Sequence, residues 1–464
     1  MKKRSGQAGK YRMRFPYDRS IWSVCQLVGP PIRSPDCNVH VSLKEIVQEG
    51  CSVEQYDIAV IGAGPAGLFC AIHAIKPGSR VLLLEKNLLP GAKLKISGTG
   101  QCNITHDGDI RTFFSRYGAH GQYLKPALLS FTNKALIHFF EERDLSMETT
   151  EGGKVFPVCR NANDVCDVLT RECLKRGVDM QCGERVHRVE NTPLRFVLYT
   201  AGNTFSAKNL VITTGGASYP KTGSTGDGYR LASSLGHTIT GIGPALTPLL
   251  IRNFPFADLA GMSFTGLPFS VWRDKRKIFE GRGDVLFTHT GLSGPGILDR
   301  SRDIQANDEI RLSFVGPVRQ DVFAKEFQDS ISRAPTREIK TIIAGFGVPE
   351  RLARQLPDLA GILADSTGAH LTAAGRTRLI GLLTACPLVI SALGDLSVAM
   401  VTRGGIALGE VNAKTMESKL VPGLFFAGEV LDIDGDTGGF NLQAAFSTGF
   451  LAAQGIHKRA GKNT

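Results

Sequence analysis

The sequence lacks the cysteine spacing of a redox or zinc site. Ten cysteines occur among its 464 residues, but no two of them form a CxxC pair. This disfavours a thiol–disulfide reductase, and no metal site is predicted. The chain also has no stretch like the apolar core of a secretory signal, so we expect reduced thiols and a cytoplasmic protein.

Long apolar runs are missing as well. The most apolar stretch, residues 379–401, is broken by Pro387, Gly394 and Asp395. A membrane helix needs roughly 20 consecutive apolar residues. We therefore expect this stretch to be buried core and the protein to have no membrane partner.

An excess of one charge is present but dispersed. The chain has 54 Lys and Arg against 43 Asp and Glu, which gives a formal charge of +11. The basic residues are scattered except for an N-terminal group and the segment 273–277. This distribution favours solubility over nucleic-acid binding. The length, with 42% apolar residues, predicts two or three domains.

The pattern along the chain changes near Tyr56. Residues 1–53 lack sustained periodicity and are expected to be a poorly ordered extension, for which a transit peptide, a mis-assigned start codon and a plain tail stay open. From Tyr56 a short β-rich run, a glycine turn, an apolar helical stretch and a second strand at 81–84 follow one another. This order predicts a β-α-β unit.

Two further patterns lie in the second half of the chain. Several β-like runs between 246 and 315, separated by Gly and Pro, predict an antiparallel sheet or barrel. Residues 319–383 have apolar positions at helical spacing, with expected breaks at Pro335, 345–349 and Pro357. Strands followed by helices therefore separate the β-α-β unit from the C-terminal region.

A glycine fingerprint links the first strand to the first helix. In Gly62-Ala-Gly-Pro-Ala-Gly67, the first glycine permits a tight turn, the second lets the backbone approach a pyrophosphate, and the third allows close packing of helix on strand. Glu85 ends the second strand 18 residues after Gly67, where a carboxylate can accept hydrogen bonds from ribose hydroxyls. An acid at this place disfavours a 2′-phosphate, so the tightly bound dinucleotide is expected to be FAD or NAD.

Later segments favour FAD. Only one fingerprint occurs, and segments 93–105 and 421–430 have the form that FAD enzymes use to seat the ribityl chain and the isoalloxazine. In the second segment, a strand delivers Glu429. Residues 438–443 then open a helix whose N-terminus can face the flavin N1/O2 edge, where a positive dipole end stabilises reduced flavin.

The longer motifs resemble a known family. The segments that carry the resemblance are Lys93–Asn103, Thr214–Tyr229, Phe287–Pro295, Thr415–Lys419 and Phe426–Gly435. Together they are similar to the BaiN/YhiN-type FAD-dependent oxidoreductases, over about residues 55–456. The resemblance implies a discontinuous Rossmann-type α/β domain for FAD, an inserted β-barrel-like domain, and a small helical insertion within that.

The expected domain boundaries follow this plan. The FAD-binding domain is predicted at 54–243 with 402–464, the β-rich domain at 244–318 with 384–401, and the helical domain at 319–383. The independent order of strand and helix patterns agrees with this division.

The sequence departs from the family pattern at four positions. Thr99 and Gln101 stand where the family usually has Gly and Arg, and Ala444 and Phe446 stand where it often has Trp. The first pair borders the expected flavin loop, and the second borders the helix under the ring. We expect FAD binding to survive these changes, and we leave substrate preference open.

The predicted cofactor-binding residues come from the glycine turn, the end of the second strand, the loop after it, the turn at 214–216 and the C-terminal strand and helix. They are Gly62, Ala63, Gly64, Pro65, Ala66, Gly67, Glu85, Lys86, Lys95, Ser97, Gly98, Gly100, Cys102, Asn103, Val186, Thr214, Gly215, Gly216, Gly428, Glu429, Gly439, Asn441, Leu442 and Gln443. Among them, Asn103 is expected to bond the ring or the ribityl chain.

No catalytic residue is assigned from the sequence. Cys102 has no partner cysteine nearby and is expected to pack rather than react. His289 can serve as a proton donor or as a hydrogen-bonded residue at a domain junction, and Tyr219 and Asp434 stay equally open.

The expected reaction uses NADH or NADPH to reduce FAD, after which flavin N5 delivers hydride to an unsaturated or carbonyl-containing small molecule. Because no second fingerprint occurs, the nicotinamide is expected to bind only transiently. The resemblance implies unsaturated steroid-like substrates for some members. An RNA-modifying flavoprotein, a non-enzymatic FAD-binding sensor and an oxidase are the alternatives, and the oligomeric state stays open.

Overall fold

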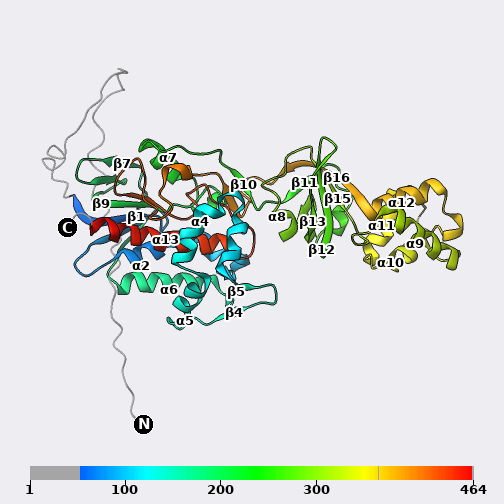
Figure 1. Ribbon diagram of the computed structural model, residues 1–464, viewed down its shortest axis with the longest axis horizontal. Helices are drawn as coiled ribbons and strands as arrows, with labels where there is room; N and C mark the ends of the chain where they lie inside the picture. The colour runs from blue at the N-terminus through cyan, green and yellow to red at the C-terminus, as the bar shows by residue number, and fades with distance from the viewer. Residues whose placement is uncertain (1–52, 364, 462–464) are drawn as a thin grey trace, which may run out of the picture. The chain divides into compact units, whose positions relative to one another are not determined.

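The computed structural model describes residues 53–363 and 365–461. The predicted extension, residues 1–53, lies outside the described residues except for Val53. In the described part, a largely parallel sheet with its helices is built from both ends of the chain, and a closed barrel and four further helices come from the middle (Figure 1). This arrangement confirms the predicted fold class.

The largest sheet has seven strands in the order β6-β2-β1-β9-β8-β7, with β18 also paired to β9. The pairs β6–β2, β2–β1, β1–β9 and β9–β18 are parallel, whereas β7 and β8 add to the sheet through antiparallel pairs. Strands buried on both faces explain the continuous apolar runs of β1 and β2. The strands are β1 (Glu54–Ile61), β2 (Val81–Glu85), β6 (Asp179–Cys182), β7 (Arg188–Asn191), β8 (Phe196–Tyr199), β9 (Thr204–Ile212) and β18 (Leu424–Phe426).

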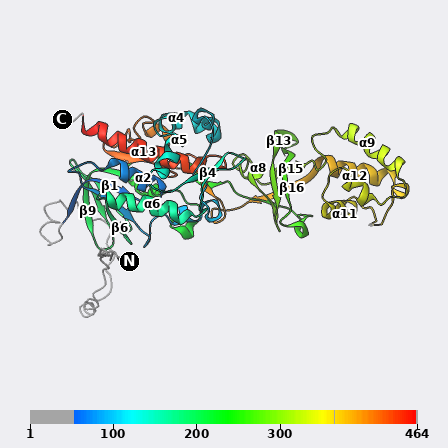
Figure 2. The same cartoon turned by 90° about the horizontal axis from the view of Figure 1, so that it is seen from below.

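Two helices that are far apart in sequence, α2 (Pro65–Ala74) and α13 (Phe440–Ala460), pack side by side (Figures 1 and 2). The ring of Phe69 contacts those of Phe131 and Phe446, with centroid distances of 4.9 and 5.2 Å. The backbones also meet, because a Cβ on Gly449 would lie 2.5 Å from the carbonyl oxygen of Ala66. The packing therefore brings the N-terminal and C-terminal motifs together.

Further helices and strands surround this sheet. The helices are α3 (Ala92–Lys95), α4 (Gly121–Ser130), α5 (Asn133–Glu141), α6 (Ala162–Lys175) and α7 (Asp227–Ser234). A three-stranded sheet is formed by β3 (Thr105–His106), β4 (Met147–Thr149) and β5 (Lys154–Pro157). Two linking strands, β10 (Gly243–Ala245) and β17 (Val401–Arg403), pair antiparallel where the chain enters and leaves the barrel region.

The barrel closes in the order β11-β14-β13-β12-β15-β16. Its strands are β11 (Leu249–Ile251), β12 (Ser263–Arg273), β13 (Arg276–Phe287), β14 (Gly291–Ser293), β15 (Glu309–Leu312) and β16 (Cys386–Leu393), and a short helix, α8 (Pro295–Leu298), follows β14. Inward side chains alternate with outward ones, and the rings of Phe256 and Phe287 stack at a centroid distance of 5.2 Å in the core. The expected barrel is thus present.

Four helices are inserted between β15 and β16: α9 (Gln320–Arg333), α10 (Ile339–Ala344), α11 (Glu350–Leu359) and α12 (Ala373–Ala385). The breaks expected at Pro335 and 345–349 fall between helices. The break expected at Pro357 is wrong, because this proline lies inside the last turn of α11, where the helix has only two residues left. None of the helices in residues 53–363 and 365–461 combines the length and the apolarity that a bilayer-crossing helix requires.

The stretch 379–401, expected as buried core, is buried only in part. Leu383, in α12, and Ile390, in β16, are fully buried, whereas Val398 and Met400 are 47% and 45% exposed. Val398 and Met400 lie after β16, on the return towards β17, and Pro387, Ser391 and Ala392 are exposed within β16 itself.

One testable feature is the backbone contact between β13 and α8. A Cβ on Gly283 would lie 2.4 Å from Gly296 Cα, so Gly283→Ala must displace α8. We expect this change to cost about 1–3 kcal/mol and to lower the thermal unfolding temperature. Gly381→Ala in α12 is the matched control, because its Cβ meets nothing within 4 Å and the change should stabilise by up to about 1 kcal/mol. Equal melting curves for Gly283→Ala and the parent would contradict the contact.

Candidate functional site

The described residues belong to one compact unit, and a cavity of about 700 Å³ passes through it. The start of α2 and the end of β2 line one part, and the start of α13 lines another. Barrel residues Leu286, Pro295 and Leu298 form a third, apolar wall. The cavity therefore joins all the regions in which the sequence predicts a cofactor.

The glycine turn has the close approaches expected of a dinucleotide site. Gly62 has a φ of +103°, and a Cβ there would lie 2.7 Å from the carbonyl oxygen of Thr213. A Cβ on Gly67 would lie 1.9 Å from the carbonyl oxygen of Gly62, so helix and turn touch. A Cβ on Gly64 would meet nothing within 4 Å, which leaves open space at the N-terminus of α2 for a phosphate group.

Glu85 lies at the end of β2, only 8% exposed, and lines the cavity. Its two carboxylate oxygens accept hydrogen bonds from the backbone N–H groups of Ala63 and Asn87, both at 2.9 Å. These bonds hold the carboxylate in place beside the glycine turn. A carboxylate oxygen can accept a further bond, so a ribose hydroxyl fits this position.

The start of α13 is held by several polar contacts. Gly439 has a φ of +94°, and a Cβ there would lie 2.4 Å from the carbonyl oxygen of Thr105. The Asn103 side chain, oriented to satisfy its neighbours, donates to Val155 O and Thr105 O and accepts from Gly439 N at 3.0 Å. Asn103 thus fixes the helix N-terminus, in addition to lining the cavity where the flavin was expected.

The loop before α13 is fixed in the same way. Asn441 Oδ1 accepts from Gly435 N and Asn441 Nδ2 donates to Gly435 O, each at 2.8 Å. These bonds fix the loop between Gly435 and Asn441, several residues of which line the cavity. The N-terminus of the 21-residue helix α13, which is the positive end of its dipole, faces the cavity.

Glu429 forms a network across the cavity wall. Lys93 Nζ donates to both of its carboxylate oxygens, at 2.8 and 3.0 Å, and to Ser218 Oγ at 2.6 Å. Thr402 N, in β17, donates to the same carboxylate at 2.8 Å. Glu429, predicted as a cofactor residue, thus also joins α3, which contains Lys93, to β17, the strand that returns from the barrel.

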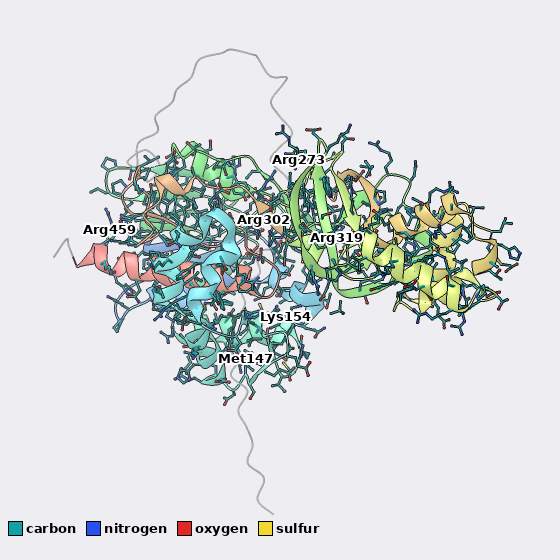
Figure 3. The ribbon with its side chains drawn as sticks, turned by 45° about the vertical axis from the view of Figure 1, so that its right-hand side comes forward. Met147, Lys154, Arg273, Arg302, Arg319 and Arg459 are labelled. Atoms are coloured by element: carbon teal, nitrogen blue, oxygen red, sulfur yellow. The ribbon has the colours of Figure 1, made fainter. Side chains whose placement is uncertain are left out.

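An ion-pair cluster joins the barrel to the loop before α13. Arg302, which is labelled in Figure 3, lies 3.3 Å from Asp434 Oδ2 and 3.2 Å from Asp436 Oδ1. Asp299 Oδ1 accepts a 2.7 Å hydrogen bond from Thr437 N. Burial raises the pKa of Asp299, and the nearby charge of Asp436 raises it further. Burial also raises the pKa of both Asp434 and Asp436.

Most predicted residues line the cavity. They are Gly62, Gly64, Pro65, Ala66, Glu85, Lys86, Ser97, Gly98, Asn103, Val186, Thr214, Gly215, Gly428, Glu429, Gly439, Asn441 and Leu442. The predicted residues outside the lining are Ala63, Gly67, Lys95, Gly100, Cys102, Gly216 and Gln443.

Two of the residues outside the lining have packing roles that explain their position. Gln443 is fully buried and bonds Thr105, Phe131 and Ser447. Cys102 is also fully buried, and burial raises the pKa of its thiol to about 12. The reactive thiolate is therefore scarce at neutral pH.

Of the open proton-donor candidates, only Tyr219 lines the cavity. It has a φ of +52°, a strained value for a residue with a side chain. His289 is exposed on the turn after β13 and does not line the cavity, and neither does Asp434, whereas Asp436 does.

Several lining residues were not predicted from the sequence. They are chiefly Asn87, Lys93, Lys154, Phe156, Thr213, Ser224, Asp227, Asp436 and the barrel residues Leu286, Ser293, Gly294, Pro295 and Leu298. Several of these residues stood inside the family motifs and could have been found there: Lys93, Ser224, Asp227, Ser293, Gly294 and Pro295. Leu286 and Leu298 carried no local signal, because only the closed barrel turns that side of α8 towards the cavity.

Three of the four departures from the family pattern now have a structural setting. Arg160 Nη1 donates to Gln101 Oε1 at 3.3 Å, so a guanidinium lies beside position 101 although the residue there is glutamine. Ala444 lines the cavity, and Phe446 is fully buried in the aromatic cluster between α2 and α13.

The fold and the cavity define a dinucleotide-binding protein of the flavoprotein type. The HI0933-like protein Rossmann domain matches residues 56–455, and the chain belongs to this family. The match confirms the resemblance to the BaiN/YhiN type and makes the chain a member of a family of FAD-dependent oxidoreductases.

Three characterised relatives align along most of the chain. A ribosomal RNA dihydrouridine synthase of Escherichia coli is 31% identical, covering 87% of this chain and 98% of its own length. A 3-dehydro-bile acid delta(4,6)-reductase of Clostridium scindens is 28% identical, covering 87% and 99%. A ribosomal RNA dihydrouridine synthase of Haemophilus influenzae is 30% identical, covering 86% and 98%.

The first test of the site is Glu85→Ala. Removing the carboxylate takes away the acceptor for two backbone N–H groups and for the ribose, so we expect FAD affinity to fall roughly tenfold to a hundredfold. Quenching of FAD fluorescence by the apoprotein measures this affinity. Glu326→Ala, at an exposed position of α9, is the control and should bind FAD like the parent. Parental affinity in Glu85→Ala would refute the assignment.

The second test is Asp299→Asn. Because the pKa of Asp299 is raised in the folded protein, ionisation of its carboxyl group lowers the free energy of unfolding. This loss of stability is absent below the unfolded-state pKa, near 4, and develops as the pH rises through the folded-state pKa. Asparagine keeps an acceptor for Thr437 N without the charge. We therefore expect Asp299→Asn to raise the melting temperature at pH 8 and to leave it unchanged at the lowest pH at which the protein is folded. A pH-independent difference would show that ionisation is not the cause.

Proposed function

We propose that the protein reduces a carbon–carbon double bond conjugated to a carbonyl group, with NADH or NADPH as electron donor and FAD as the bound carrier. The substrate class is a small unsaturated molecule. The supporting observation is that the cavity continues past the start of α13 to the apolar barrel wall of Leu286, Pro295 and Leu298. A planar, largely apolar acceptor fits beside a flavin in such a space.

The residues present fit FAD. Open space at Gly64, the fixed carboxylate of Glu85 and the inward-facing N-terminus of α13 suit the pyrophosphate, the ribose and the N1/O2 edge of the ring, respectively. When bound, FAD supplies the acceptance and delivery of hydride.

The chain's own groups contribute orientation, charge and exclusion of water. The α13 N-terminus offers a positive potential to the anion that forms at the flavin edge. Asn103 and Asn441 hold that helix start in place. The apolar residues of α8 and β13 exclude water from the far wall, and Arg302 keeps the barrel against the loop before α13.

The names of the relatives support the reaction class. Dihydrouridine arises when the double bond of uracil that is conjugated to its carbonyl is saturated, and a delta(4,6)-reductase saturates ring double bonds of a 3-oxo compound. Both reactions add hydride to an electron-poor carbon. A single fingerprint for a tightly bound dinucleotide supports transient use of the nicotinamide.

A second candidate is reduction of uridine within RNA. It is supported by the names of two relatives and by a basic, aromatic tip on the β12–β13 hairpin, where Arg311 lies 4.2 Å from the Trp272 ring centroid and Lys277 lies 5.6 Å from it. Lys277 and Arg311 are also paired with Glu280 and Glu309, which reduces their free charge. This candidate predicts RNA binding that weakens steeply with salt.

The deciding experiment follows the visible flavin spectrum without oxygen. We expect NADH or NADPH to bleach the holoenzyme, and a 3-oxo-4,6-diene steroid to restore the oxidised spectrum while losing its conjugated absorbance. Restoration by a uridine-containing RNA alone would favour the second candidate. Reoxidation by oxygen but by neither acceptor would contradict both and favour an oxidase.

A further inference from the structure

The inference concerns the corner of the cavity next to the start of α13. Lys154 and Phe156 are two residues apart on β5, so they share one face of the strand, and both line the cavity. Lys154 pairs across the sheet with His106, whose ring stacks on Phe440 at a centroid distance of 5.2 Å. Since Phe440 is the first residue of α13, Lys154, which is labelled in Figure 3, lies near the start of α13, where the proposed function puts the N1/O2 edge of the flavin.

Lys154 differs from the other cations that line the cavity. Lys86 and Arg185 are paired with Asp227, at 2.8 and 2.7 Å, and Lys93 is paired with Glu429 at 2.8 Å. Lys154 has neither an ion pair nor a side-chain hydrogen bond to any residue in the described ranges, although it is only half exposed and lines the same cavity. Its charge is thus available to a ligand.

A second donor stands close by. Gln101 lines the cavity, and its Oε1 is occupied by Arg160 Nη1. This bond orients the amide, so that Nε2, which has no partner among the described residues, keeps both of its N–H groups for a ligand. Arg160 is itself held over the Phe156 ring, 4.2 Å from its centroid, and is paired with Glu148.

Apolar residues also line this cavity. They include Ile96, Phe156 and Leu286, together with Pro295 and Leu298 of α8. A ligand that packs against these apolar residues and also accepts hydrogen bonds from Lys154 and Gln101 has an apolar or flat body and one anionic group.

We propose that Lys154 and Gln101 form an anion subsite that binds a carboxylate or phosphate group carried by the substrate. This inference rests on the proposed function, because it names a feature of the substrate of the same site. A carboxylate on a small-molecule acceptor and a phosphate on a uridine nucleotide share the required chemistry.

The test measures binding to the oxidised holoenzyme, so no turnover is needed. Two matched pairs of probes differ in one charge: a 3-oxo-Δ4 steroid carboxylic acid with its methyl ester, and uridine 5′-monophosphate with uridine. Each is titrated while the flavin difference spectrum is recorded. We expect the charged member of one pair to bind about tenfold tighter or more, and that pair identifies the source of the anion.

The variant Lys154→Met should bring this charged-to-neutral ratio close to one while leaving the affinity for the neutral probe unchanged. Gln101→Leu should lower the ratio by a smaller factor. Lys325→Met, which removes an exposed lysine of α9, is the matched control and should keep the full ratio.

Two results would overturn the subsite. The first is that the charge of the probe does not matter, seen either as an unchanged ratio in Lys154→Met or as no discrimination by the parent in either pair. The other is a Lys154→Met variant that alters the flavin spectrum without any probe yet keeps the ratio, which would place Lys154 on the flavin instead. If the probes behave as expected but reduced enzyme transfers hydride to no unsaturated acceptor, the proposed reaction fails and the anion subsite stands.

Discussion

The site depends on a backbone contact between α2 and α13. Gly449 brings the two helices so close that its missing side chain would meet the carbonyl oxygen of Ala66. The N-terminus of α2 carries the glycine turn, and that of α13 carries the second set of glycines, so their separation is set by this contact. A dinucleotide has a nearly fixed length when extended. The distance between the two helix starts is therefore part of the binding site. The contact that sets this distance involves only the backbone of Gly449 and the backbone carbonyl group of Ala66.

Motifs whose geometry is local could be predicted from the sequence. The turn at Gly62, the acid at the end of β2 and the glycine start of α13 each need a few neighbouring residues, and all three line one cavity. Within a motif the sequence could not separate residues that face the cavity from those that face the core. Gly67 and Gln443 are examples, because their roles are in close packing and in buried hydrogen bonds with distant residues.

Residues brought in by the tertiary fold could not be predicted. Leu298 reaches the cavity only because the barrel closes and Gly283 lets α8 lie against β13. Lys154 lies on a short strand with no recognisable motif, and its proposed role depends on its lacking an ion-pair partner among residues 53–363 and 365–461, which only a structure can reveal. Gln101 was noticed as a departure from the family pattern, but its link to Arg160 joins residues 59 positions apart.

The paired link of β10 and β17 has an evolutionary consequence. The chain leaves for the barrel and returns from it along two adjacent, antiparallel strands, so both cut points of the insertion lie side by side. The segment between β10 and β17, which holds the barrel and its four helices, is therefore an insertion, here called the cassette. Its length and sequence can change while the domain that contains the glycine turn keeps its own connections. Diversification of acceptors within such a lineage would then concentrate in the cassette and in the few cavity residues that face it.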